Sequence, residues 1–521
     1  MQADLVLPIP PQAPATEASG TPFARSATQR RGLLARVVGT VVPLAFVAAG
    51  TYAWAMGWQA TYPLHLTSIE DTFWNHISPW TWYGVAAGTL ALVSVVLLRS
   101  SPGVAAVATV AFVMSFSSSI LLRYIGGADT PGVVALTSNL VATNQIDLAV
   151  HQYLQWPVTF LGLGGLALAT GLTLASAAQG AFLVIAVSVS LALFVLFGRD
   201  HWAAAATGLF FVVSTPFLNW QLSPQLLAFL MLIGLLLLGR SRGIASVSVS
   251  SGLFVLLCFT HPFVSLWFIM LALCVRVVAP ISRRLRLAQV QSWYLSPTLL
   301  AAVQIAVIVY VATAMLHDLA TAVKRIGEAL ESGGSIAAAI SISTVGSGDP
   351  DSPLYRGLVL VATAGVGAAG LLLAAGSLLR WRNRRTQPIE AGLAAVGLGH
   401  YVIGLVAPVL GGRGLQLVAL ALPPGLRDLA GRGKRSHLVG LAVSLVLLAS
   451  PAIVATSMRY DTRYLTPGLQ SAAELAVGEL AADDPVLGAE VVVHYVQNLA
   501  TVRLNGISPR FAHRSDLFDL R

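Results

Sequence analysis

The chain has 521 residues, of which 56% are hydrophobic and only 10% are charged. A soluble domain carries about 25% charged residues, and the mean hydropathy of +0.76 points away from one as well. Composition therefore excludes a soluble domain and predicts an all-α polytopic membrane protein. The net charge of +9 comes from arginine clusters between apolar segments, which indicates membrane topology rather than a nucleic-acid-binding face.

Residues 1–30 are rich in proline, alanine, threonine and serine, and they contain no apolar run, which predicts a disordered cytoplasmic tail. A transmembrane domain is predicted over residues 31–456. Most of its apolar segments approach the roughly 20 residues that a membrane-spanning helix needs. These segments cover 37–57, 82–98, 103–122, 158–176, 180–198, 203–219, 224–239, 244–260, 263–279, 293–316, 357–378, 390–410, 414–430 and 437–456.

The basic residues predict which segments cross. If every apolar segment crossed, most arginines after residue 176 would lie outside, against the positive-inside rule. Segment 158–176 follows Trp156-Pro157 and contains glycine breaks, so we expect it to lie along the outer interface. About 13 transmembrane helices then remain by the length criterion, with the N-terminus inside and the C-terminus outside. Residues 457–521 lose the membrane composition and are predicted to form a small extracytoplasmic segment on the outer face.

Polar side chains gather in the outer segment 123–157, which contains acids, amides, an imidazole and aromatic rings between two apolar segments. A connector between helices needs only a few turn residues. We therefore expect 123–157 to be the catalytic loop, since loops held by a rigid scaffold are where functional groups concentrate. The outer segments 58–81 and 317–356 are also long, and the second has a Gly/Ser-rich tip.

Short motifs follow one another in a characteristic order: an apolar helix ends in GGADT and is followed by HQYLQWP, by the interfacial ATGLTLAS and by STPFLNWQLSPQ. This order resembles the GT-C superfamily of membrane glycosyltransferases. The plan is similar to that of lipid-A aminoarabinose transferases and protein O-mannosyltransferases, over about residues 103–520. The resemblance implies inverting transfer of a sugar from a polyprenyl-phosphate donor to a glycan, lipid or protein acceptor, on the outer face of the cytoplasmic membrane.

Two carboxylates are candidates for the general base that an inverting transfer needs. Asp129 follows Gly126-Gly127 and precedes Thr130-Pro131, so it sits at a tight break directly after a helix. The same Asp-Thr-Pro pattern is also an ordinary helix start, and the two roles are compatible. Asp71 is the rival base, because the acidic motif of the family usually follows the first span, and Glu70-Asp71 does so here.

Arg413 lies between glycines in an outer loop and is the first candidate for binding the donor phosphate, because a guanidinium fork matches two phosphate oxygens. Arg123 is the second candidate. Both are also compatible with interfacial arginines that contact lipid headgroups. The candidates for substrate binding share a position near an outer helix end, where they could instead be turn or anchor residues; they are His151, Gln152, Tyr153, Gln225 and His261.

No DxD, HExxH or clustered carboxylate motif predicts a metal site, and no cofactor is predicted with certainty, although a divalent cation bridging Asp129 or Asp71 to phosphate stays open. No Walker A or glycine-rich nucleotide loop occurs either. Three other functions remain as alternatives: a polysaccharide-lipid ligase, a transporter or flippase of a lipid-linked precursor, and a non-catalytic membrane scaffold that presents its C-terminal segment to a partner. A transporter would spread polar groups along several spans, whereas here they collect at the outer edge.

Overall fold

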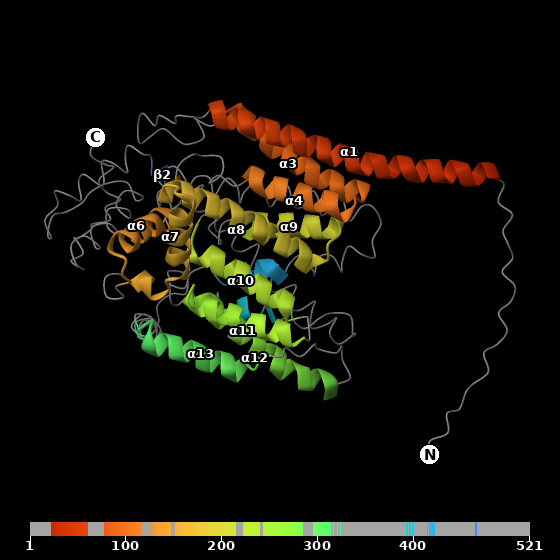
Figure 1. Cartoon of the computed structure of the whole chain (residues 1–521). Helices are drawn as coiled ribbons and strands as arrows, with labels where there is room; N and C mark the ends of the chain where they lie inside the picture. Colours follow the sequence, from red (N-terminus) through yellow and green to blue (C-terminus); the bar gives the residue numbers. More distant parts are fainter. Residues whose placement is uncertain are drawn as a thin grey trace, which may run out of the picture.

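The computed structural model describes residues 22–60, 78–116, 125–126, 129–146, 152–214, 222–239, 243–284 and 295–313, with short runs and single positions between 316 and 465. The described residues are almost entirely helical (Figure 1), which confirms the all-α prediction for this part of the chain. Three described helices are long and apolar enough to cross a membrane: Leu33–Gly57 within α1, Pro79–Leu98 and Leu174–Phe197. That composition is compatible with a membrane protein. Most of the spans expected after residue 357 lie outside the described residues.

The helices form a layered bundle (Figure 1). At one face α1 (Pro22–Ala60) packs on α3 (Pro79–Leu98), and α3 packs on α4 (Pro102–Phe116). The other described helices are α6 (Asp129–Thr143), α7 (Val158–Thr170), α8 (Leu174–Phe197), α9 (His201–Ser214), α10 (Pro224–Leu238), α11 (Ile244–Cys258), α12 (Pro262–Arg284) and α13 (Pro297–Tyr310).

Helix α1 begins at Pro22, inside the segment for which we expected a disordered tail. Proline suits the first turn of a helix, and no helix breaker occurs between Pro22 and the first glycine, Gly32. The helix continues to Ala60, and its packing on α3 relies on small residues. A Cβ atom added to Gly50 would lie 3.4 Å from the Cβ of Ala87 and 3.5 Å from the carbonyl oxygen of Gly84. The two backbones therefore approach closely, as small residues allow in membrane helices.

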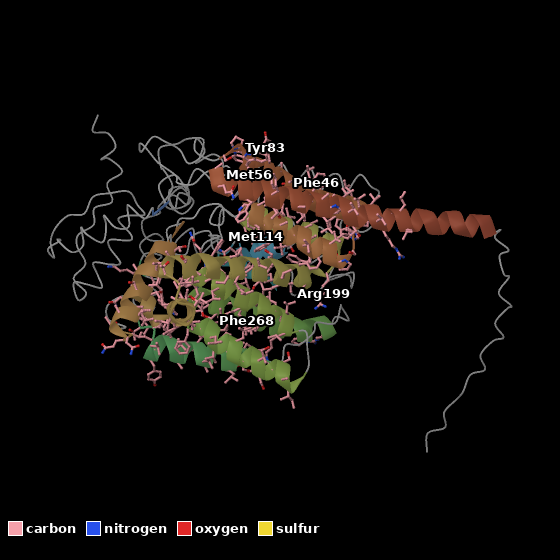
Figure 2. The ribbon with its side chains drawn as sticks, turned by 45° about the horizontal axis from the view of Figure 1, so that its top comes forward. Phe46, Met56, Tyr83, Met114, Arg199 and Phe268 are labelled. Carbon is pink, nitrogen blue, oxygen red and sulfur yellow. The ribbon has the colours of Figure 1, made fainter. Side chains whose placement is uncertain are left out.

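Basic side chains mark one end of the bundle, which we call the arginine end. Arg99 follows α3 and Arg199 follows α8, both with positive φ values, of 52° and 61°. Helices α4 and α9 start just after these arginines and pack against each other, with the rings of Phe112 and Phe211, ten residues into each helix, 6.2 Å apart. Figure 2 shows Arg199 at this end, away from Tyr83.

The opposite end carries α6 and α7, and we call it the α6–α7 end (Figure 1). Residues 129–143, which we expected to lie in a loop, form the 15-residue helix α6. Burial explains the difference, since Val133, Val134, Leu136 and Leu140 are all buried in the bundle. The polar residues of this stretch obscured its apolar core.

Helix α7 has 13 residues and ends at Gly171, whose φ of +68° closes it in a left-handed cap. Its length of about 20 Å is short of the roughly 30 Å hydrocarbon core, and Figure 1 shows it inclined to the long helices at the α6–α7 end. One face packs on α6, with Phe160 and Leu163 buried, while Leu161 and Leu168 are exposed. This geometry is compatible with the expected interfacial position of segment 158–176.

Candidate functional site

Segments far apart in the sequence converge at the α6–α7 end. The hydroxyl of Thr130, in the first turn of α6, donates a hydrogen bond to the carbonyl of Leu222, just before α10, at 3.1 Å. The amide of Val158, the first residue of α7, donates to the carbonyl of Phe259, just after α11, at 3.4 Å. A two-residue antiparallel pair adds β1 (Ile125–Gly126) and β2 (Tyr464–Leu465). The starts of α6 and α10 therefore meet, as do the start of α7 and the end of α11, and all four lie at the α6–α7 end.

Asp129 is the first residue of α6, so the Asp-Thr-Pro sequence does start a helix as expected. The strand β1, three residues earlier, contacts both α6 and α8. The backbone of Asp129 therefore lies at the α6–α7 end. Its neighbour Thr130 is held to the segment before α10 by the hydrogen bond to the carbonyl of Leu222. The catalytic role of Asp129 stays a prediction.

The start of α10 lies at the same place. Ser223 is buried, and its hydroxyl oxygen accepts a hydrogen bond from the amide of Leu226 at 3.2 Å, which caps the helix. Pro224 follows at the first helical position, where its missing N–H costs nothing. Gln225 comes next and is 7% exposed. The motif SPQ thus encodes a helix start that buries an amide side chain at the α6–α7 end.

Three buried polar atoms in this region have no hydrogen-bond partner among the described residues: Nε1 of Trp156, Oγ1 of Thr159 and Nε2 of Gln225. Their side chains are 6%, 3% and 7% exposed. Trp156 and Thr159 lie on either side of the start of α7, and α7 packs against α10, which carries Gln225. Each atom is part of a neutral group that can donate a hydrogen bond.

Among the described residues, no other threonine has a buried hydroxyl group without a hydrogen-bond partner. Thr109 donates to the carbonyl of Ala105 at 2.7 Å, and Thr207 donates to the carbonyl of Ala203 at 2.8 Å. In both cases the acceptor is the backbone carbonyl four residues earlier in the same helix, which is the usual partner of a buried helical threonine. Thr159 lacks that bond because it stands in the first turn of α7, so its hydroxyl is available to a partner from outside the helix.

His261 precedes α12 and is half-buried, with its ring 5.9 Å from the ring of Phe263. One turn further, Trp267 is buried and its indole Nε1 donates a hydrogen bond to Nδ1 of His400 at 3.2 Å. The rings of Phe263 and His400 lie 6.3 Å apart. A line of aromatic and imidazole rings therefore runs from the start of α12 into the bundle.

His400 is a residue that our sequence analysis missed. It lies in the apolar segment 390–410 and is 7% exposed. An ionisable residue inside a predicted span is by itself a signal of function or of a specific partner. Because Nδ1 of His400 accepts from Trp267, a neutral ring carries its proton on Nε2. Trp267 therefore selects one tautomer of a buried histidine.

Several candidates from the sequence cannot be placed. Asp71, Arg123, His151 and Arg413 lie outside the described residues. Gln152 starts the short 3₁₀ helix η1 (Gln152–Gln155), next to the half-exposed Tyr153. Of the substrate-binding candidates, the structure brings Gln225 and His261 to the α6–α7 end, and the η1 residues precede α7 there. Within the described part of the chain, no three or more histidine, cysteine or acidic side chains are grouped to hold a metal, and the divalent cation stays an open possibility.

Comparison with protein-family models finds no match, and no curated protein matches the chain significantly.

Proposed function

We propose that the protein is a membrane glycosyltransferase that moves a sugar from a polyprenyl-phosphate donor to a glycan, lipid or protein acceptor on the outer face of the cytoplasmic membrane. The observation that supports this most is the convergence, at one end of an apolar bundle, of Asp129, the start of α7 and the start of α10. The site combines the predicted base with buried neutral donors. The end position suits a substrate whose lipid chain stays in the membrane while its reactive head projects from it.

The proposed mechanism is a single displacement. The carboxylate of Asp129 removes the proton from an acceptor hydroxyl as that oxygen attacks the anomeric carbon of the donor. The bond between the anomeric carbon and the phosphate oxygen breaks, the sugar inverts, and polyprenyl phosphate leaves. Arg413, and secondarily Arg123, is proposed to bind the phosphate and to stabilise the charge that develops on it. A divalent cation could share that role without changing the balance of the reaction.

A transfer assay tests this function and separates it from the alternatives. The purified protein is incubated with undecaprenyl phosphate carrying a radiolabelled sugar, together with membrane extract as the source of acceptor. We expect label to leave the lipid and undecaprenyl phosphate to accumulate. A flippase would move the intact donor across a bilayer without cleaving it. A polysaccharide-lipid ligase would leave this monophosphate donor intact and consume a polysaccharide linked to lipid diphosphate.

The proposed orientation places the arginine end in the cytoplasm and the α6–α7 end outside. Arg99, Arg199 and Arg284 all follow or end helices at the arginine end, as the positive-inside rule would require of a cytoplasmic end. A reporter enzyme fused after Arg521 should therefore be active outside, and one inserted at Arg384 should be active in the cytoplasm. Both reporters on the same side would show that the number of spans between them is wrong.

A further inference from the structure

We infer that Trp156, Thr159 and Gln225 form a subsite for the neutral hydroxyl and ring oxygens of the transferred sugar; this inference rests on the proposed function. The three polar atoms are buried and have no partner among the described residues. A buried polar group without a hydrogen bond is destabilising. Such groups are rare in folded proteins, so three of them at the starts of two helices that pack together point to a partner that the protein alone does not supply.

The chemistry of the three groups favours a sugar over the other part of the same donor, its phosphate. The indole N–H and the amide NH₂ donate hydrogen bonds, and the threonine hydroxyl can donate or accept. Sugar oxygens are acceptors, and sugar hydroxyls also donate. None of the three groups is a cation, whereas a phosphate taken away from water needs charge compensation. The subsite therefore suits the uncharged part of the donor, while the phosphate is left to the proposed arginines.

Position supports the same assignment. Trp156 and Thr159 are three residues apart across the start of α7, and Gln225 is in the first turn of α10, against which α7 packs. Asp129 starts α6, which packs on α7, and its neighbour Thr130 is bonded to the carbonyl of Leu222, just before α10. The predicted base and the three donors thus belong to α6, α7 and α10, which lie at the same end of the bundle.

The test uses three substitutions that remove one polar atom and preserve most of the side-chain shape: Trp156→Phe, Thr159→Val and Gln225→Met. Two matched controls make the same chemical change where the hydrogen bond is satisfied inside the protein. These controls are Trp267→Phe, which removes the donor to His400, and Thr109→Val, which removes the donor to Ala105.

The first readout is binding of defined lipids to the full-length protein. The probes are undecaprenyl phosphate alone and undecaprenyl phosphate carrying glucose, mannose or arabinofuranose. We expect the three variants to bind the best sugar-bearing probe about three- to tenfold more weakly than wild type, which is the range for one neutral hydrogen bond. Binding of undecaprenyl phosphate alone should be unchanged, and the control Thr109→Val should bind every probe as wild type does.

The second readout is the unfolding temperature without lipid. Because the three atoms are unpaired in the ligand-free protein, their removal should leave the unfolding temperature unchanged or raise it. Trp267→Phe breaks a buried bond, so it should lower that temperature. A purely structural role for Trp156, Thr159 and Gln225 would instead lower the unfolding temperature of their variants as well.

Each outcome bears on a different claim. If wild type prefers a sugar-bearing probe and all three variants keep that preference, the subsite is wrong while the proposed function stands. If the variants lose affinity for undecaprenyl phosphate alone to the same degree, the three groups bind phosphate and the assignment to sugar is wrong. If wild type binds none of the four probes, the proposed function fails and this inference fails with it.

Discussion

Replacing Asp129 with asparagine should slow sugar transfer by about 100- to 10,000-fold, which is the usual cost of losing a general base. Asparagine has nearly the same shape as aspartate and is an equally good residue at a helix start, so α6 should still begin at this position. Expression, membrane insertion and donor binding should therefore be retained. The measurement is the initial rate of sugar release from the labelled donor, with the amount of inserted protein determined in parallel.

The matched control is Asp71→Asn, because Asp71 is the rival base. If Asp129 is the base, the Asp71 variant should retain most of its activity. The opposite pattern, with full activity after Asp129→Asn and loss after Asp71→Asn, would move the base to the segment between α1 and α3. The α6 start would then be a structural cap alone.

Replacing Gly397 with alanine should give the largest loss of stability among the glycine substitutions in the described helices. The added Cβ would lie 2.6 Å from the carbonyl oxygen of Gly414 and 2.9 Å from the amide nitrogen of Val418. These are backbone atoms of a facing segment and cannot rotate away, so the two segments must separate. Overpacking of this kind costs about 1–3 kcal/mol. The separation would also disturb the bond between Trp267 and His400, since His400 lies three residues further along.

Gly399→Ala is the control, at a helical position two residues away. A Cβ at Gly399 would meet nothing within 4 Å. Alanine is favoured over glycine in a helix by roughly 0.5–1 kcal/mol, so this variant should unfold at the same temperature or a higher one. The measurement is the thermal unfolding temperature of both variants in detergent, which should be lower for Gly397→Ala than for Gly399→Ala. Equal unfolding temperatures would mean that the close approach of residues 397 and 414 is relieved without cost.

Much of the fold follows from sequence because apolar composition and turn residues are local signals. The apolar segments from 82–98 to 263–279 correspond to described helices. Helix α3 starts at Pro79 and α8 at Leu174, a few residues before the apolar segments that predicted them. The start of α6 at Asp129 was predictable from Asp-Thr-Pro. The rest of α6 was not, because its polar residues suggested a loop, and only packing shows that Val133 and Leu136 form a buried face.

The candidate site was predictable in part. Gln225 and His261 were expected at outer helix ends, and both lie at the α6–α7 end of the bundle. The bond between Trp267 and His400 could not be predicted, because it joins residues 133 positions apart in two apolar segments. The unpaired hydroxyl of Thr159 was also hidden, since a threonine in a helix normally bonds to its own backbone. Only the structure shows that this hydroxyl is buried and lacks such a bond.

The central claim is that sugar transfer takes place at the α6–α7 end of the bundle, outside the cytoplasm. The most direct test is the sidedness of transfer in sealed vesicles that contain the full chain, with the orientation fixed by the reporter after Arg521. Labelled undecaprenyl phosphate-sugar is supplied to one leaflet at a time. We expect release of undecaprenyl phosphate when the donor is on the side of the C-terminus, and none when it is on the side of Arg199. Release only from the Arg199 side, or passage of the intact donor through the bilayer without release, would rule out transfer at the α6–α7 end.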